Sequence, residues 1–443
     1  MSTVWSVVRS RMVLLLAAIA ATSMAIAACG DDDDDDADPA ATATQAAAAP
    51  APEPGEALKI GFLADFSGPL AEYGADIQTG IELAIKHIND AGGVNGQDVT
   101  FVTGDTRVDP TQSVEEARRL VDVEGVHAIV GPLASTATLA VADSVTGPSG
   151  IPQISPSATS PALTDASDNG YLFRTTGSDA VQGVVLAALV ESEGHTNVGV
   201  IYRDDAWGQG LSDVFTENFS GTATLASYAA DGQASYLAEL QQAASGGAEV
   251  LVAMGFAETE VFIRESIEND IFTSFIFTDG NKSEDLIAQI GAEYLDGAVG
   301  TAPSSDPENA STQAWDAAYE AEYGRLPSLP FVREAYDAVI AIALAAEAAG
   351  FIEGSHLREI HRAAIRDQLA AISGPPGDTY IAGPEGVAAA LAAARNGDDI
   401  NFEGAATPID WNDAGDVTSG FMEIWGYRDG ALVTIEVRPF NLE

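Results

Sequence analysis

The sequence predicts an α/β protein with two lobes, each built on a doubly wound parallel sheet. Short apolar segments of strand length alternate with longer segments whose apolar residues recur at helical spacing, which is typical of parallel βαβ units. This alternation runs twice along the chain, once before Phe173-Arg174 and once after it. The 443 residues, 46% of them hydrophobic, are enough to form the cores of two or three domains.

The first series begins with a strand pattern over 59–66, which stops at Ser67-Gly68-Pro69. A helix is expected over 73–91, because isoleucines recur there every three or four residues and Gly92-Gly93 ends the run. The same unit then repeats, with strands expected at 99–103 and 127–130 and helices at 111–123 and 136–145.

The second series repeats the alternation and then becomes mainly helical. In open parallel sheets, ligands bind outside the carboxyl ends of the strands, so we expect the two lobes to face one cleft. A Gly-containing turn at Asp429-Gly430 predicts a β-hairpin near the C-terminus. The expected strands are 198–202, 250–254, 275–277, 297–301, 421–427 and 432–437; the expected helices are 211–219, 236–244, 259–269, 312–323, 332–349 and 357–371.

Composition excludes several classes of function. The chain has 19 Lys and Arg against 67 Asp and Glu, a formal net charge of −48, so it would repel a phosphate backbone and nucleic acid is not an expected partner. Its single cysteine, Cys29, excludes an intrachain disulfide and a cysteine zinc cage.

The N-terminus predicts export and lipid attachment. Arg9 and Arg11 precede an apolar run over 12–28, the pattern of an export signal, and Ile26-Ala27-Ala28-Cys29 resembles the bacterial lipobox. Residues 1–28 are therefore expected to be a lipoprotein signal peptide, with Cys29 the lipid attachment site on the outer face of the cell membrane. An uncleaved signal anchor with an incidental cysteine is the alternative, because the run is nearly long enough to span a bilayer.

The remaining domain boundaries follow from composition and from the two series. Residues 29–57 are acidic and rich in Ala and Pro, which predicts an extended linker; a calcium site at its six consecutive Asp residues is the alternative. We expect 58–175 with 303–374 to form lobe 1 and 176–302 with 375–443 to form lobe 2. The chain would then cross between the lobes near Thr175–Thr176, near Ala302–Pro303 and at a third point after Gly374.

Seven segments match one known family: 66–74, 87–96, 109–110, 129–132, 155–164, 173–175 and 204–210. By these segments the chain, from about residue 58 onward, resembles the leucine/isoleucine/valine-binding proteins. These proteins are extracytoplasmic receptors of ABC importers with the type I periplasmic-binding-protein fold. The resemblance implies that a small amino acid of the branched-chain type binds between two closing lobes and passes to permease and ATPase subunits, with no cofactor.

The resemblance also implies which residues of lobe 1 bind the ligand. Ser135 matches the serine that holds the ligand carboxylate; a helix N-cap is its alternative role. Ala158 and Thr159 match a backbone carbonyl and a hydroxyl that contact the ammonium and carboxylate, or they form only a Pro-bracketed turn. Tyr73 matches an aromatic lid, and its alternative role is packing in the core.

In lobe 2 the matching residues depart from the family pattern. Trp207 and Phe256 stand where the family often has Tyr, so the ligand is expected to be held there more by apolar contact. Asp279 matches the acid that pairs with the ammonium, although the leucine-type receptors often have the longer Glu. Its alternative role is to cap a helix that begins near Lys282.

Catalysis and metal binding have little support in the sequence. Gly208-Gln209-Gly210 lacks the third glycine of a dinucleotide fingerprint, and His356 and His361 do not share one helical face. No serine has a partner histidine in a nucleophile motif, so we expect neither an enzyme nor a metal site. Three functions stay open: an amino-acid receptor of an importer, an amino-acid sensor feeding a signalling partner, and a receptor for amides, urea or small aromatic acids.

Overall fold

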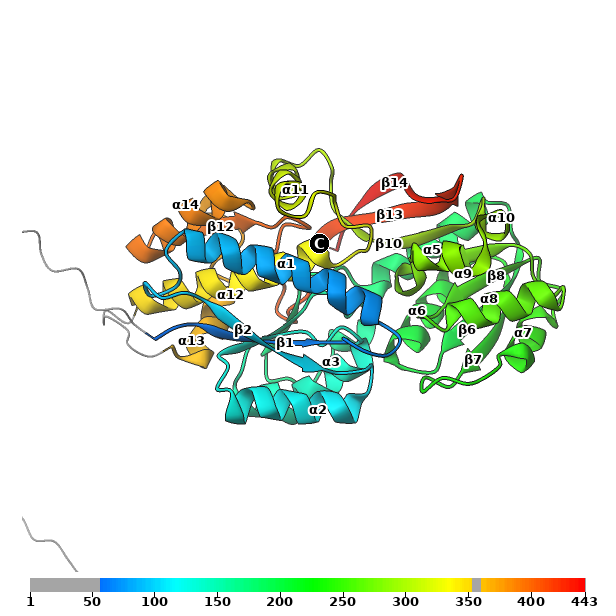
Figure 1. Ribbon diagram of the computed structural model, residues 1–443, viewed down its shortest axis with the longest axis horizontal. Helices are drawn as coiled ribbons and strands as arrows, with labels where there is room; N and C mark the ends of the chain where they lie inside the picture. Colours follow the sequence, from blue (N-terminus) through cyan, green and yellow to red (C-terminus); the bar gives the residue numbers. More distant parts are fainter. Residues whose placement is uncertain (1–55, 353–359, 443) are drawn as a thin grey trace, which may run out of the picture. The chain divides into compact units, whose positions relative to one another are not determined.

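The computed structural model describes residues 56–352 and 360–442 (Figure 1). The expected signal peptide, Cys29 and most of the expected linker lie outside these residues, as does the start of the helix expected over 357–371. Within the described ranges, no helix is both long and apolar enough to cross a bilayer.

The first sheet is parallel throughout, with the strand order β2-β1-β3-β4-β5. Alternate residues of β1 serve two cores, because side chains of a strand point to opposite faces. Ile60 and Phe62 join the core that includes α1, whereas Leu63 packs in the cluster of Leu120. The strands are β1 (Lys59–Ala64), β2 (Thr100–Asp105), β3 (Ala128–Val130), β4 (Gln153–Ser155) and β5 (Leu172–Arg174).

Helices cover both faces of this sheet and complete lobe 1. On one side α1 packs against α12 and α14, and on the other α2 packs against α3. A Cβ at Gly80 would lie 2.2 Å from the carbonyl oxygen of Val332, so glycine permits the close approach of α1 to α12. The helices are α1 (Ala71–Asp90), α2 (Pro110–Arg118), α3 (Ser135–Val141), α4 (Gly147–Ser149), α11 (Ala310–Tyr323), α12 (Val332–Ile352), α13 (Arg362–Leu369) and α14 (Pro384–Asn396), with π-helical turns at Arg119–Val123 and Ala142–Thr146.

The second sheet forms the centre of lobe 2 and has the strand order β14-β13-β10-β9-β8-β6-β7. Five of its strands are parallel, and β13 and β14 add an antiparallel hairpin. The expected hairpin is confirmed: Asp429 and Gly430 both have positive φ, as its tight turn requires. The strands are β6 (Asn197–Arg203), β7 (Thr222–Tyr228), β8 (Val250–Met254), β9 (Phe275–Phe277), β10 (Val299–Ser304), β13 (Ser419–Arg428) and β14 (Ala431–Asn441).

Lobe 2 is also covered on both faces, so the expected pair of doubly wound α/β lobes is confirmed. Val198 and Val200 of β6 share a core with residues of α5 and α6, while Ile201 of the same strand packs in the cluster that contains Leu240 of α7 and Phe262 of α8. The helices are α5 (Asp179–Ser192), α6 (Ala206–Asn218), α7 (Leu237–Ala244), α8 (Thr259–Glu268), α9 (Asp285–Ile290) and α10 (Ala292–Leu295).

The structure differs from the expected lobe boundary after Gly374. The helix α14 packs against α1 and α12, and β11 (Asp378–Ile381) pairs with β12 (Ile400–Glu403) in a separate two-stranded sheet, so this segment lies against lobe 1. Only β13 and β14 join the second sheet. The third crossing therefore comes directly before β13, and the other two follow β5 and β10. The sequence interpretation also missed α5, whose residues are apolar on almost every side.

Candidate functional site

Five of the seven predicted ligand-binding residues line one small cavity between the two lobes, which we call the cleft cavity. Its volume is about 20 Å³, close to the space of one water molecule. A ligand of amino-acid size can therefore enter only when the lobes move apart. The predicted residues that line it are Tyr73, Ser135, Trp207, Phe256 and Asp279; Leu70, Ile77, Leu133, Ala134, Ser157, Gly280 and Phe331 complete its wall.

Tyr73 connects the two lobes across the cleft cavity. Its hydroxyl lies 2.6 Å from the carbonyl oxygen of Asp279 and 2.8 Å from that of Lys282, and its single proton can be donated to either. The ring comes from α1 in lobe 1, whereas both carbonyls belong to the turn after β9 in lobe 2. Burial raises the pKa of Tyr73 well above its usual value, so the phenol stays a neutral donor. Tyr73, predicted to be an aromatic lid, thus forms a hydrogen bond between the lobes and also lines the cavity.

An aromatic wall forms the lobe 2 side of the cavity. The rings of Trp207 and Phe256 stack with centroids 4.8 Å apart, and the guanidinium of Arg203 lies 4.4 Å from the centre of the Phe256 ring. Asp205 caps α6 by accepting hydrogen bonds from the backbone amides of Trp207 and Gly208, which fixes the start of the helix that carries the indole. In the described part of the chain, the buried indole N–H of Trp207 has no acceptor.

Two buried carboxyl groups, Asp279 and Asp179, interact beside the cavity. Asp279 is 3% exposed and accepts a 2.8 Å hydrogen bond from the side-chain amide of Gln182. Burial raises the pKa of Asp279 to about 6, and burial together with the charge of Asp279 raises the pKa of Asp179 well above its usual value. The described residues leave Oδ1 of Asp179 and Oε1 of Gln182 without a hydrogen-bond donor. Of these three side chains only Asp279 lines the cavity, so a cation bound there would meet the carboxylate of Asp279.

Capping at this turn is provided by another residue. Thr278 is the N-cap of the 3₁₀ turn Asp279–Asn281 and forms a capping box with Asn281, while α9 starts only at Asp285. The alternative role of Asp279 as the cap of a helix near Lys282 is therefore wrong. Its carboxyl group instead interacts with Gln182 and with the backbone amides of Asp279 and Gly280.

The loop after β4 differs in detail from the expectation. Ser157 lines the cavity, whereas Ala158 is fully buried in a cluster with Ala142, Leu163 and Leu172. The backbone carbonyl oxygen of Ala158, the group that the resemblance assigned to the ligand, lies 3.4 Å from Nη1 of Arg174. Thr159 is buried behind the cavity, and its hydroxyl donates a 2.9 Å hydrogen bond to Asp179.

Ser135 lies at the first turn of α3 and does not cap it. The N-cap position belongs to Ala134, and no side chain caps the helix, so the alternative role of Ser135 as an N-cap is wrong. Its hydroxyl oxygen accepts a 3.2 Å hydrogen bond from the backbone amide of Ser160. Ser135 lines the cavity, so its hydroxyl proton can be donated to an acceptor on a ligand.

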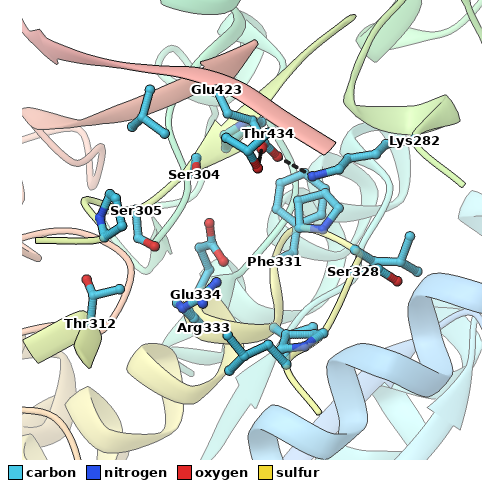
Figure 2. A pocket seen from close by; sticks show the side chains of 18 of the residues that line it. Lys282, Ser304, Ser305, Thr312, Ser328, Phe331, Arg333, Glu334, Glu423 and Thr434 are labelled. Carbon is cyan, nitrogen blue, oxygen red and sulfur yellow. Dashed lines mark hydrogen bonds and ion pairs between the residues drawn. The ribbon is translucent and has the colours of Figure 1, made fainter. Parts of the chain in front are cut away.

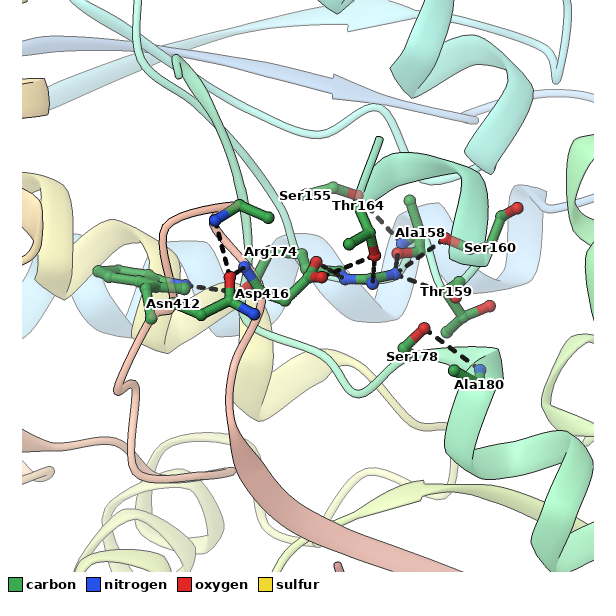
Figure 3. A network of polar contacts seen from close by, with 12 residues as sticks. Ser155, Ala158, Thr159, Ser160, Thr164, Arg174, Ser178, Ala180, Asn412 and Asp416 are labelled. Atoms are coloured by element: carbon green, nitrogen blue, oxygen red, sulfur yellow. Dashed lines mark hydrogen bonds and ion pairs between the residues drawn. The ribbon is translucent and has the colours of Figure 1, made fainter. Parts of the chain in front are cut away.

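Arg174 holds the loop that carries Ser157 to Ser160 (Figure 3). The guanidinium is 1% exposed, donates to the carbonyl oxygens of Thr159 and Ser160 at 3.0 Å each, and pairs with Asp416 at 2.7 Å. Asp416 comes from the segment before β13, so this network joins two of the three crossings between the lobes. Buried ion pairs of this kind depend on such complete hydrogen bonding.

Sequence reasoning missed Asp179, Gln182, Ser157 and Arg174 as site residues. A signal for two of them exists, because Asp179 and Gln182 are polar residues three positions apart at the start of α5, where they precede a run of apolar residues. Across residues 56–352 and 360–442, no group of three or more His, Cys, Asp or Glu side chains is arranged to hold a metal ion.

Comparisons with known proteins agree with this architecture. The profile of a family described as "Periplasmic binding protein" matches residues 57–404. The Leu/Ile/Val-binding protein homolog 1 of Brucella suis biovar 1 (strain 1330) is 33% identical over 301 residues, which cover 66% of this chain and 78% of that protein. The chemotactic signal transduction system substrate-binding protein BasB of Halobacterium salinarum is 28% identical over 407 residues, covering 86% and 90% of the two chains.

A solved structure shares the fold over most of the chain. It is the branched-chain amino acid transporter substrate binding protein LivJ from Streptococcus pneumoniae, in complex with isoleucine. The TM-score is 0.68 at 26% sequence identity, and the match covers 87% of this chain and 100% of that one. The two-lobed arrangement described above is therefore shared with a solved substrate-binding protein.

Proposed function

The chain belongs to the periplasmic binding protein family and has its type I fold, and from this premise we propose that it is an extracytoplasmic receptor for an amino acid with an apolar side chain. The observation that carries the proposal is that a buried carboxyl group, a hydroxyl and aromatic rings together line the cleft cavity. Asp279 and the stacked rings of Trp207 and Phe256 line the cavity from lobe 2, and Ser135 lines it from lobe 1.

Each part of a zwitterionic amino acid has a matching group in this arrangement. The ammonium group pairs with Asp279, which otherwise lacks a cationic partner at the cavity, because an uncompensated charge in a dry cleft is costly. The carboxylate accepts a hydrogen bond from the hydroxyl of Ser135, whereas the hydroxyl of Ser157 already donates to the carbonyl oxygen of Leu133. The apolar side chain contacts Trp207 and Phe256, and the indole N–H supplies one more donor.

Recognition would be coupled to movement of the lobes. The ammonium partner belongs to lobe 2 and the carboxylate donor to lobe 1, so a ligand satisfies both ends only when the lobes approach. The Tyr73 hydroxyl then bonds to the turn that carries Asp279. The three crossings after β5, after β10 and before β13 would act as the hinge.

We assign the delivery step to an ABC permease and its ATPase, with the protein held at the outer face of the membrane by lipid on Cys29. The acidic segment that follows Cys29 would act as the spacer. A sensory role is the second candidate, because BasB, a relative over most of both chains, carries a chemotactic name. The third candidate is a receptor for amides, urea or small aromatic acids. These ligands are not zwitterions, so they would match only part of the groups that line the cavity.

Calorimetric titration of the purified chain with leucine, isoleucine and valine, and in parallel with acetamide, urea and benzoate, tests the proposal. The expected result is saturable binding of one or more of the amino acids and weaker or absent binding of the other three ligands. Tighter binding of benzoate or an amide than of any amino acid would contradict it. Importer and sensor are then separated by whether loaded protein stimulates ATP hydrolysis by the permease complex.

A further inference from the structure

A second, larger pocket lies between the lobes next to the β10 crossing, and we call it the hinge-side pocket (Figure 2). Its volume is about 460 Å³, within the usual range for small-molecule sites. Residues 326–334 and α11 contribute its lobe 1 side, and Lys282, β10 and the β13–β14 hairpin contribute its lobe 2 side. None of the predicted ligand-binding residues lines this pocket, so binding of an amino acid in the cleft cavity gives it no role.

Most charges in the hinge-side pocket already have partners. Lys282 forms a buried ion pair with Glu423, whose other oxygen accepts a 2.8 Å hydrogen bond from the hydroxyl of Thr434. Arg333 forms an ion pair with Asp316. These contacts make two neutral pairs, one on each side of the pocket.

Glu334 is the exception. The residue is 4% exposed, and Figure 2 shows its carboxylate pointing into the space among the lining side chains. Within residues 56–352 and 360–442, backbone amides of Phe331 and Glu334 donate to its carboxyl group, and no cationic side chain forms an ion pair with it; the charge of Arg333, which is paired with Asp316, acts on it from nearby. Burial raises the pKa of Glu334 to about 7, the direction expected for a carboxylate without a counter-charge.

The rest of the wall suits a small organic molecule. Pro303, Leu329, Phe331 and Val437 give apolar surface, and the hydroxyls of Ser304 and Ser305 give hydrogen-bonding groups. Phe331 has a φ of 77°, a strained conformation for a bulky residue, and it lines both this pocket and the cleft cavity. Strain of this kind persists where the surrounding structure imposes it.

We propose that the hinge-side pocket is a second ligand site, for a small organic cation whose ammonium or amidinium group pairs with Glu334 and whose apolar part lies against Leu329 and Phe331. The cation supplies the counter-charge that the pocket lacks. A neutral molecule of the same shape leaves the Glu334 carboxylate uncompensated, so charge decides the selectivity. The site is separate from the amino-acid cleft and does not depend on what the cleft binds.

Benzamidine is a suitable probe, because it combines an amidinium with a flat apolar ring, and neutral benzamide is its matched control. Titrated into the full-length chain at pH 8, benzamidine is expected to bind saturably and benzamide at least tenfold more weakly. Glu334→Gln, which keeps the shape and removes the charge, should weaken benzamidine at least tenfold. Glu320→Gln, an exposed acid on α11, should leave it unchanged.

A cleft variant locates the binding. Asp279→Asn should leave benzamidine affinity unchanged if the probe occupies the hinge-side pocket, and its loss in that variant would place the probe in the cleft and overturn the proposal. The proposal would also be overturned by equal affinity for benzamide or by unaltered binding to Glu334→Gln. A third contrary result is no binding of benzamidine up to about 10 mM, a concentration at which even a weak specific site would be filled. Thermal unfolding of Glu334→Gln checks that the variant is folded.

Discussion

The side-chain amide of Gln182 donates a 2.8 Å hydrogen bond to Oδ1 of Asp279, and the same nitrogen lies 3.2 Å from the carbonyl oxygen of Thr301. Gln182 is on α5, the first helix after the chain enters lobe 2, whereas Asp279 follows β9. The amide therefore fixes the orientation of the carboxyl group before any ligand arrives. The residue also lines the cleft cavity.

Replacing Asp279 with Asn tests its role as the ammonium partner. Asparagine has the shape of aspartate and can still accept the hydrogen bond from Gln182, but it carries no charge. Amino-acid affinity should therefore fall by roughly 1.5–3 kcal/mol, the range for hydrogen bonds to charged groups. Folding stability should stay level or rise, because a buried charge is removed. Calorimetry measures the affinity, and Asp213→Asn, an exposed acid on α6, is the control. Unchanged affinity in Asp279→Asn would contradict the assignment.

Amino-acid binding should depend on pH through the same carboxyl group. In the proposed binding mode the ionised form of Asp279 pairs with the ammonium, and burial raises the pKa of Asp279 to about 6. Affinity should therefore be constant above about pH 7 and fall by up to about tenfold per pH unit below about pH 6. Asp179, whose pKa is also raised, titrates together with Asp279, so the pair sets the profile. Titrations between pH 5 and 8 check this, and a flat profile would argue against the carboxylate.

Stability without ligand should show the opposite trend. An unfolded Asp titrates near 3.8, and folded Asp279 near 6, so the folded state binds more protons between these values. The free energy of unfolding should thus decrease as pH rises from about 4 to 6, as far as this residue contributes. Asp279→Asn removes that contribution, and urea unfolding of both proteins at several pH values measures the difference. Identical slopes would mean that Asp279 is not buried as described.

Helical spacing and turn chemistry were sufficient to predict most of the fold. The periodic isoleucines of α1 are buried against the sheet, and Asp429-Gly430 makes the turn of the C-terminal hairpin. The packing of α14 on lobe 1 could not be predicted, because its alanine-rich sequence fits either lobe and its partners α1 and α12 are distant in sequence. Only the tertiary contacts assign the segment after Gly374.

The candidate site was partly predictable for a similar reason. The resemblance identified five residues that line the cleft cavity, since each belongs to a recognisable local motif. The interaction of Asp179 with Asp279 joins residues that are distant in sequence and depends on where the chain enters lobe 2. The resemblance did not single out Ser157, which lines the cavity, although it pointed to the neighbouring Ala158, whose side chain packs in a separate cluster.

Trp207→Phe separates the two contributions of the indole. Phenylalanine keeps an aromatic ring beside Phe256 but removes the N–H that has no acceptor within the described residues. If this group donates to the ligand, affinity should fall by about two- to tenfold, equivalent to one neutral hydrogen bond. Trp315 is a matched control. Its buried N–H also has no acceptor within the described residues, but the ring lies on α11 of lobe 1 and does not line the cleft cavity. Trp315→Phe should leave affinity unaltered; an equal loss in both variants would indicate a general packing effect.

Lipid attachment is tested by Cys29→Ser. Acyl chains hold a protein at a membrane by about 0.8 kcal/mol per buried CH₂, so their loss should release the chain to the soluble fraction. Amino-acid binding should be unchanged, because the cleft residues all lie in the folded body. Fractionation after a high-salt wash gives the answer, and a variant that stays with the membranes would favour an uncleaved signal anchor.

Arg174 should act on ligand binding through the loop that it holds. Arg174→Met removes the donors to Thr159 and Ser160 and leaves Asp416 buried without its partner, so stability should fall by roughly 3–5 kcal/mol. Adding Asp416→Asn removes the uncompensated charge and should restore part of the stability, since the pair is coupled. It should not restore affinity, because the loop carbonyls still lack their donors. Chemical unfolding and calorimetry on both single variants and the double variant separate the two effects. Affinity that returns together with stability would mean that Arg174 supports the fold and does not position the loop.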